Sequence, residues 1–176
     1  MSSLLAFRRM ILVALAALPM VLWGCGGDEN DEPPQILAHQ NPVAFQNFAV
    51  GAPAQQFQVI LMNDGGGTLD ITDVQVRGDA NCALNPAPAL DSPLPVSLTN
   101  TEQAFLNMTY IPGGTANGVV GTKDQISIAI SSNSAEYPLF EISVCGCVID
   151  HEPTQEDPGP PCDCNLLEVG DANCGG

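Results

Sequence analysis

Alternating apolar and polar residues dominate the middle of the chain, from about residue 40 to residue 149. In the stretch 55–63, Phe57, Val59 and Leu61 share one side while the intervening glutamines face the other, as on a half-buried β-strand. The segments predicted as strands are 43–48, 55–63, 69–76, 96–98, 106–110, 126–130 and 140–144. Seven short strands separated by turn residues, with no apolar pattern of helical period, indicate an all-β sandwich of two sheets.

Two local irregularities refine this pattern. Leu69 and Ile71 share one face, whereas Val74 and Val76 have the opposite parity, so a one-residue slip at 72–73 is needed to place all four on one face. A β-bulge produces such a slip. The sequence Asp-Gly-Gly-Gly at 64–67 is typical of a hairpin-type turn that tolerates positive φ.

The first 24 residues have the layout of a secretory signal. Arg8 and Arg9 are the only charges in the first 27 residues, and the apolar run 10–23 follows them. This run is too short to cross a hydrocarbon core of about 30 Å, which needs roughly 20 residues. A positive segment followed by a short apolar segment favours a cleaved signal peptide over an uncleaved anchor helix.

The end of this leader, Leu22-Trp23-Gly24-Cys25, resembles the lipobox of bacterial lipoproteins. The resemblance implies cleavage after Gly24 and attachment of a diacylglycerol and a further acyl chain such as palmitate to Cys25. The residue after the lipidated cysteine is Gly26. Lipoproteins that stay at the inner membrane carry Asp at this position, so the resemblance favours the outer membrane. An ordinary signal peptide with a chance cysteine is the alternative. Several acyl chains anchor a protein firmly without a membrane span.

Charge excludes some partners. Beyond the leader the chain keeps two basic residues, Arg77 and Lys123, against 20 acidic ones, a net charge of −18. Nucleic-acid binding depends on several Lys or Arg residues that neutralise phosphates, so this chain is unsuited to it. The acidity is typical of a soluble, self-repelling surface.

The composition predicts four parts. These are a signal peptide at 1–24, a lipidated and disordered acidic linker at 25–39, the sandwich at 40–149, and an acidic tail at 150–176 that is rich in proline and cysteine. His39 lies in the predicted linker and His151 in the tail, and neither is near a patterned nucleophile.

Several motifs follow one another in the middle of the chain. The first is the segment VAFQNFAVGAPAQQFQVILMNDGGGTLDITDVQVRGDANCAL, with Phe45, Asn63, Gly65 and Asp79, and MTYIP, IAISSN and ISVCG follow in order up to Gly146. Together they resemble the bacterial choice-of-anchor D domain, which is related to the immunoglobulin-like ASH and Hydin domains. The family implies a seven-stranded immunoglobulin-like sandwich without a catalytic constellation, although the cysteines are not a family feature.

The chain has seven cysteines, which could form disulfides or bind a metal ion. With Cys25 assigned to lipid, the disulfide candidates are Cys82, Cys145, Cys147, Cys162, Cys164 and Cys174. An exported chain meets an oxidising compartment, which favours disulfides. Six cysteines allow 15 pairings, and the preferred one joins the two Cys-x-Cys units and pairs the remaining two cysteines with each other.

Two features bear on that preference. Both cysteines of the first Cys-x-Cys unit alternate with the apolar residues of their strand, so they should point outward, and they lie about 6–7 Å apart, too far to bond to each other. The alternative is a zinc or copper(I) site made of four thiolates, although zinc prefers Cys-x₂₋₄-Cys spacing.

These observations predict a lipid-anchored, non-enzymatic protein of the cell envelope with a structural or protein-binding role, such as adhesion or scaffolding, that needs no cofactor. A periplasmic metal-binding lipoprotein is the alternative. The partner, and the side of the outer membrane that the domain occupies, stay open.

Overall fold

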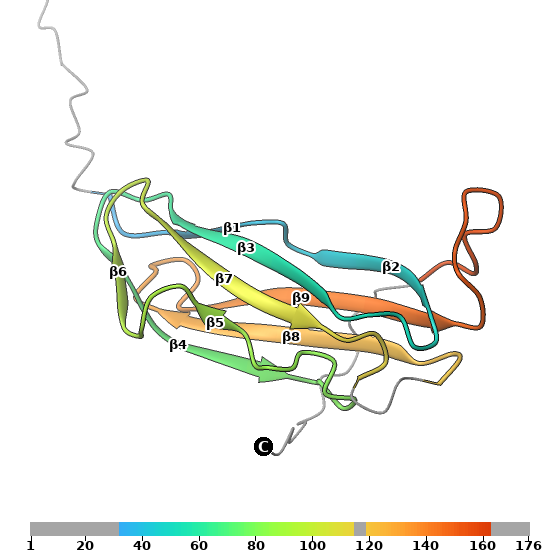
Figure 1. The fold of residues 1–176 in the computed structure, drawn as a ribbon. Helices are drawn as coiled ribbons and strands as arrows, with labels where there is room; N and C mark the ends of the chain where they lie inside the picture. The colour runs from blue at the N-terminus through green and yellow to red at the C-terminus, as the bar shows by residue number, and fades with distance from the viewer. Residues whose placement is uncertain (1–31, 115–118, 163–176) are drawn as a thin grey trace, which may run out of the picture.

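A computed structural model describes residues 32–114 and 119–162, and every regular element within these ranges is a β-strand (Figure 1). The strands are β1 (Ile36–His39), β2 (Val43–Ala49), β3 (Gln55–Asn63), β4 (Leu69–Arg77), β5 (Ala89–Leu90), β6 (Val96–Leu98), β7 (Gln103–Tyr110), β8 (Lys123–Ser132) and β9 (Leu139–Ile149). Among these residues no helix is long and apolar enough to cross a membrane. The all-β prediction is confirmed.

The strands form two sheets that pack face to face (Figure 1). One sheet has the order β1-β3-β7-β5, and the other has the order β2-β9-β8-β4-β6. Antiparallel pairing prevails, but β2 runs parallel to β9, which follows it by about 100 residues. The chain therefore changes sheets between β1 and β2, and the first strands close one edge of each sheet.

The alternation seen in the sequence sets the core. On β7, Leu106, Met108 and Tyr110 are buried, while Asn107 between them is exposed. The sheets meet along such inward-facing residues, whose burial supplies the main driving force for folding. The largest fully buried side chains are Tyr110, Leu61, Leu69, Ile71, Leu106, Ile126, Ile128, Ile130, Ile142, Val59, Val144 and Val148.

The predicted bulge in β4 is present. Ile71 pairs with Ser132, and Asp73 pairs with Ser131, so one extra residue lies on β4 between these two pairs. The extra residue reverses which side chains of the following residues face the core, so Val74 packs against the core as Ile71 does before the bulge. The parity of the apolar residues alone located this irregularity correctly.

The predicted boundary between linker and domain is wrong. β1 pairs residue by residue with β3, from Ile36 opposite Asn63 to His39 opposite Ile60, so the domain begins before residue 40. Ile36 is 4% exposed and belongs to the core. The proline-rich surroundings concealed this strand, and the two-residue β5 was also missed. The seven predicted strands are all found among the nine strands of residues 32–114 and 119–162.

The glycine turn has a different role from the predicted one. β3 and β4 belong to different sheets, so residues 64–67 connect the two layers instead of closing a hairpin, and none of these glycines has positive φ. A Cβ atom on Gly65 would collide with the carbonyl oxygen of Pro33 and would lie 2.7 Å from the amide nitrogen of Gln35. Glycine is needed here because the incoming chain passes directly over the turn.

Asn63 holds this corner together. The side chain is fully buried, its Oδ1 accepts the amide hydrogens of Gln35 (3.2 Å) and Gly65 (3.0 Å), and its Nδ2 donates to the carbonyls of Gly67 (2.6 Å) and Leu98 (3.0 Å). One side chain thus satisfies backbone groups from three separate segments of the chain, at residue 35, at residues 65–67 and at residue 98.

Candidate functional site

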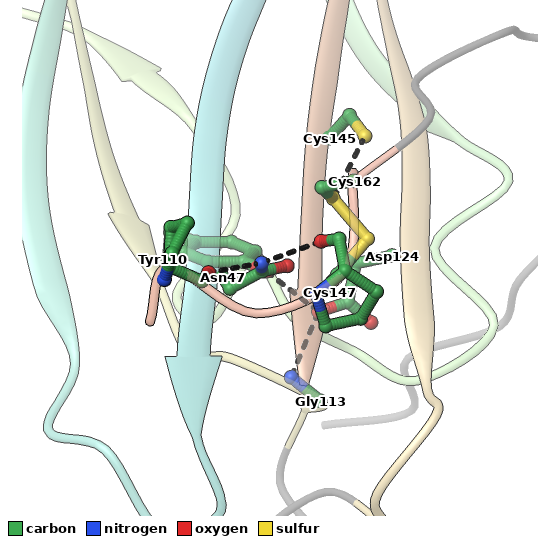
Figure 2. Close-up of a disulfide and its surroundings, with 9 residues drawn as sticks. Asn47, Tyr110, Gly113, Asp124, Cys145, Cys147 and Cys162 are labelled. Carbon is green, nitrogen blue, oxygen red and sulfur yellow. Dashed lines mark hydrogen bonds between the residues drawn. A yellow bond between two sulfur atoms is a disulfide. The ribbon is translucent and has the colours of Figure 1, made fainter. Parts of the chain in front are cut away.

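Cys145 and Cys147, the first Cys-x-Cys unit, meet Cys162 of the second unit on the five-stranded sheet. Cys147, on β9, forms a disulfide with Cys162 in the segment that follows the last strand, and their Cα atoms are 5.7 Å apart (Figure 2). The Sγ atom of Cys145 lies only 4.0 Å from that of Cys162. The bond ties the segment 150–162 back onto the sheet. It joins one cysteine of each Cys-x-Cys unit, as the preferred pairing predicted.

The remaining cysteines divide into two groups. Cys82 and Cys145 are also in disulfides. Cys164 and Cys174 lie outside the described residues, as do Cys25, the cleavage position Gly24 and the leader. Cys145, which was predicted to point outward, is not part of the core cluster, yet its side chain is only 2% exposed.

Asn47 supports the same segment from the neighbouring strand. Its Nδ2 donates to the carbonyls of Pro158 and Pro160, both at 2.7 Å (Figure 2). Gly159, between them, has φ of +79°, and a Cβ atom there would lie 2.8 Å from Cδ1 of Ile149 and 2.9 Å from Asn47 Nδ2. The turn 158–160 is therefore fixed by a buried amide and needs glycine at its centre.

Shallow cavities flank this contact. One of about 340 Å³ lies between β9 and the prolines of the segment, with Val120, Lys123, Val148 and Pro161 among its lining residues. Another of about 470 Å³ lies between β2 and the same prolines and includes Phe45. Their walls are mostly apolar, and nothing in them resembles the convergent polar groups of a catalytic pocket.

A buried carboxylate lies on the core side of β9. Asp124, at the start of β8, is 3% exposed and accepts hydrogen bonds from the hydroxyl of Tyr110 (2.8 Å) and the amide of Gly113 (2.8 Å) (Figure 2). The side-chain amide of Asn81 also donates to this carboxylate (3.0 Å). Burial, followed by the negative charge of Asp124, raises the pKa of Tyr110 far above its ordinary value. The phenol therefore stays protonated and acts as a structural donor.

Tyr110 also organises the aromatic core. Its ring stacks on Phe45 with centroids 4.4 Å apart and contacts Phe48 at 5.6 Å. Its ring and hydroxyl lie over Gly146, where a Cβ atom would come within 2.7 Å of Cζ and closer still to the hydroxyl. The glycine between Cys145 and Cys147 is thus required by the tyrosine beneath it, a constraint that the sequence did not signal.

Asp79 serves the loop after β4. It is 2% exposed, and its carboxylate accepts the amide hydrogens of Ala83 (2.6 Å) and Leu84 (2.9 Å). Burial is the main cause that raises the pKa of Asp79. Because this aspartate is buried, its carboxylate holds the loop in place and is not presented at the surface.

The histidines form no catalytic pair within the described ranges. His39 is exposed on β1. His151 contacts Asp150 (Nδ1 to Oδ1, 2.6 Å) and Asp157 (Nε2 to Oδ2, 3.4 Å), and the contact with Asp150 is the main cause that raises the pKa of His151. Residues 32–114 and 119–162 contain no group of three or more His, Cys, Asp or Glu side chains that could hold a metal ion.

No protein-family model matches the sequence, and no curated protein is significantly similar to it. Among solved structures, a protein of unknown function from Porphyromonas gingivalis W83 is similar at 16% identity and a TM-score of 0.50, and the match covers 70% of this chain and 50% of that one. The chain therefore spans about half the length of that structure.

Two further structures show weaker likeness. The ASH/PapD-like domain 7 of human CEP192 matches at 12% identity and a TM-score of 0.44, over 82% of this chain and 100% of that one. The secreted serine protease VesC from Vibrio cholerae matches at 11% identity and a TM-score of 0.44, over 69% of this chain and 25% of that one. At these identities the comparisons concern the fold alone, and the sandwich of two β-sheets predicted from the sequence is confirmed by the strand pairing.

Proposed function

We propose that this chain is a lipid-anchored, non-catalytic protein of the cell envelope whose sandwich has a structural or protein-binding role. The observation that carries the proposal is the disulfide between Cys147 and Cys162, which clips the segment after the last strand to the outer face of the sheet. Disulfides form and persist in oxidising compartments, which supports a location outside the cytoplasm.

The leader supplies the route to that compartment. Its two arginines, its apolar run and the sequence before Cys25 together resemble a lipoprotein signal. We place the anchor at Cys25, seven residues before the first described residue, Glu32, and we expect the outer membrane because Gly26 follows Cys25. The chain between anchor and sandwich is rich in acidic residues and proline, as is typical of a solvated spacer.

A binding or structural role fits the geometry better than catalysis. The buried polar groups, Asn63, Asp79 and Asp124, are engaged by backbone or side-chain donors that hold loops in place. Asp79 and Asp124 line a small cavity whose lining includes no Ser, Thr, Cys or His side chain. We therefore expect the partner to be another envelope protein that contacts the surface of the sandwich.

The anchor can be tested directly. Cells that express the full chain are fed an alkyne-tagged fatty acid, and the protein is then fractionated and its N-terminal peptide analysed by mass spectrometry. We expect a triacylated Cys25 in the outer-membrane fraction. The variant Cys25→Ser should lose the label and leave that fraction, whereas the matched variant Asn100→Ser, which leaves every cysteine in place, should keep both. A mature protein that starts at Met1, or an unmodified Cys25, would refute the anchor.

Thiol titration separates the proposal from the metal-binding alternative. Protein purified without reductant and denatured in the presence of a maleimide should show no free thiol. Four reactive thiols together with stoichiometric zinc or copper would support the alternative, because a thiolate site needs reduced cysteines.

A further inference from the structure

We infer that the second half of β4 is a docking edge for a second copy of this chain, and that two copies pair antiparallel there about a two-fold axis at Gln75. The pairing joins the two five-stranded sheets into one continuous sheet. This inference goes beyond the proposed function, because it names a surface for self-association and does not depend on a lipid at Cys25.

β4 has a strand on both sides only along its first half. β8 pairs with β4 as far as Arg77, whereas β6 pairs with it only from Leu69 to Ile71 (Figure 1). The residue before β6 is Pro95, which has no amide hydrogen and cannot extend the ladder. In the described part of the chain no other strand pairs with β4 on this side. The second half of β4 is therefore a sheet edge, and such an edge is a template for another strand.

The backbone groups of this edge point away from β8 in a regular order. The amide of Val74 donates to the carboxylate of its neighbour Asp73 at 2.9 Å, so this amide is not used in the ladder with β8. In an antiparallel ladder the amide and carbonyl of every second residue point to the same side. The amides and carbonyls of Val74 and Val76 are therefore the groups that a docked strand would bond.

The side chains of the edge select a second copy as the docked strand. Asp73 and Gln75 share the outer face, where the amide of Gln75 donates to Asp73 Oδ2 at 2.6 Å, and Arg77 follows on the same face. Val74 and Val76 pack toward the core. In an antiparallel pair centred on Gln75, position 73 of one copy lies opposite position 77 of the other. Opposite charges then meet on each side of the axis, and the free backbone groups of Val74 meet those of Val76 in the second copy.

The scarcity of cations makes this match specific. Arg77 is one of only two basic residues after the leader, and its ion pair with Glu141 is exposed and 3.5 Å long. Such a surface pair is worth little, so Arg77 can exchange it for a contact across the axis. Centring the two strands on a neighbouring residue instead would place Asp73 or Arg77 opposite the uncharged Gln75. Cross-strand charge pairs therefore favour the register centred on Gln75.

The edge is short and partly shielded, so we expect the dimer to be weak and reversible. The bulge at 72–73 and the carboxylate over the amide of Val74 both limit indiscriminate pairing. Each copy also carries a net charge of −18 after the leader, which repels the other copy at long range. Salt at about 0.15 M screens charges beyond about 8 Å but acts less on a direct contact. Moderate salt should therefore favour the dimer over low salt.

A cysteine at the axis tests the geometry. In the proposed pairing residue 75 faces its own copy as a non-hydrogen-bonded pair, with Cα atoms about 4.5 Å apart, which is within the range of a disulfide. The full chain with Gln75→Cys should therefore form a covalent dimer in envelopes prepared without reductant, as seen on a non-reducing gel. The matched variant Gln58→Cys, at an exposed position of β3 in the other sheet, should stay monomeric.

Three results of this experiment would overturn the inference. These are no covalent dimer with Gln75→Cys, equal amounts of dimer with both variants, or a crosslink from position 75 to a different protein. None of them bears on the lipid at Cys25, so the proposed function is tested separately.

Exchanging the two charges tests the register. The dimer fraction of the full chain, purified in detergent, is measured by sedimentation at about 0.15 M salt. Asp73→Arg and Arg77→Asp each place like charges opposite one another twice in the dimer, and each should weaken association about tenfold. The double variant Asp73→Arg/Arg77→Asp restores opposite charges across the axis and should associate within about twofold of the native chain.

This rescue distinguishes pairing between copies from a role within one copy. The double variant loses both the carboxylate over the amide of Val74 and the ion pair with Glu141, so a role within one copy would leave it the most impaired of the three. A double variant that associates more weakly than either single variant would refute the register. A native chain that stays monomeric up to about 1 mM would refute the docking edge itself.

Discussion

Gly146 offers a sharp test of the packing beneath the disulfide. The substitution Gly146→Ala places a methyl group 2.7 Å from Cζ of Tyr110, well inside the contact distance of two carbon atoms. Tyr110 cannot swing away freely, since it is fully buried, stacked on Phe45 and bonded through its hydroxyl to Asp124. Either the strand or the ring must move.

The cost follows from these contacts. Overpacking a well-filled core costs about 1–3 kcal/mol. If the ring shifts enough to break the hydrogen bond to the buried carboxylate of Asp124, a further cost of about 1.5–3 kcal/mol is added. We therefore expect Gly146→Ala to lower the free energy of unfolding by about 3–5 kcal/mol.

Urea unfolding followed by circular dichroism, with disulfides intact, measures this change. For a domain of this size the midpoint should fall by about 2–3 M. Ser143→Ala, on the outward face of the same strand, is the matched control and should stay within about 0.5 kcal/mol of the native protein. In a double-mutant cycle with Tyr110→Phe, the two effects should be less than additive by about 1 kcal/mol, since the hydroxyl's hydrogen bond is lost only once. A stability of Gly146→Ala within about 0.5 kcal/mol of the native protein would refute the reasoning.

Three further predictions follow from the same contacts. Asn63→Ala should lower the free energy of unfolding by about 2–4 kcal/mol in urea, because it leaves buried backbone groups unpaired, and an unchanged midpoint would contradict that role. The pKa of Tyr110 is raised in the folded state, so above pH 10 the folded state keeps a proton that the unfolded state loses. The free energy of unfolding should therefore be unaffected below pH 10 and fall above it by up to about 1.4 kcal/mol per pH unit. Tyr110→Phe should remove this part of the pH dependence in urea midpoints measured between pH 9 and 10.5, and an identical slope would count against it. Arg77→Ala should change stability by less than about 0.5 kcal/mol, because its 3.5 Å ion pair with Glu141 is exposed; a larger thermal shift would show that the pair matters.

The sequence determined the strands that carry a clear alternation of apolar and polar residues. The side-chain period of a strand is local, so the buried positions of β3, β7 and β8 could be identified without knowledge of their partners. The same local logic located the bulge of β4, since a change of parity requires an extra residue. The cysteines predicted an oxidised tail, and one bond between the two Cys-x-Cys units is present.

Only the tertiary structure decided what depends on residues distant in the chain. β1 is a strand because it pairs with β3, and its own four residues between a proline-rich stretch and a turn carry too little pattern to show this. The need for glycine at positions 65 and 146 arises from the backbone of Pro33 and the ring of Tyr110, each brought close by folding. Likewise, the alternation placed Cys145 outside the core, but only the fold buries it, with its Sγ atom 4.0 Å from that of Cys162. Local periodicity fixes which way a side chain points, whereas the neighbours it meets there are set by long-range pairing.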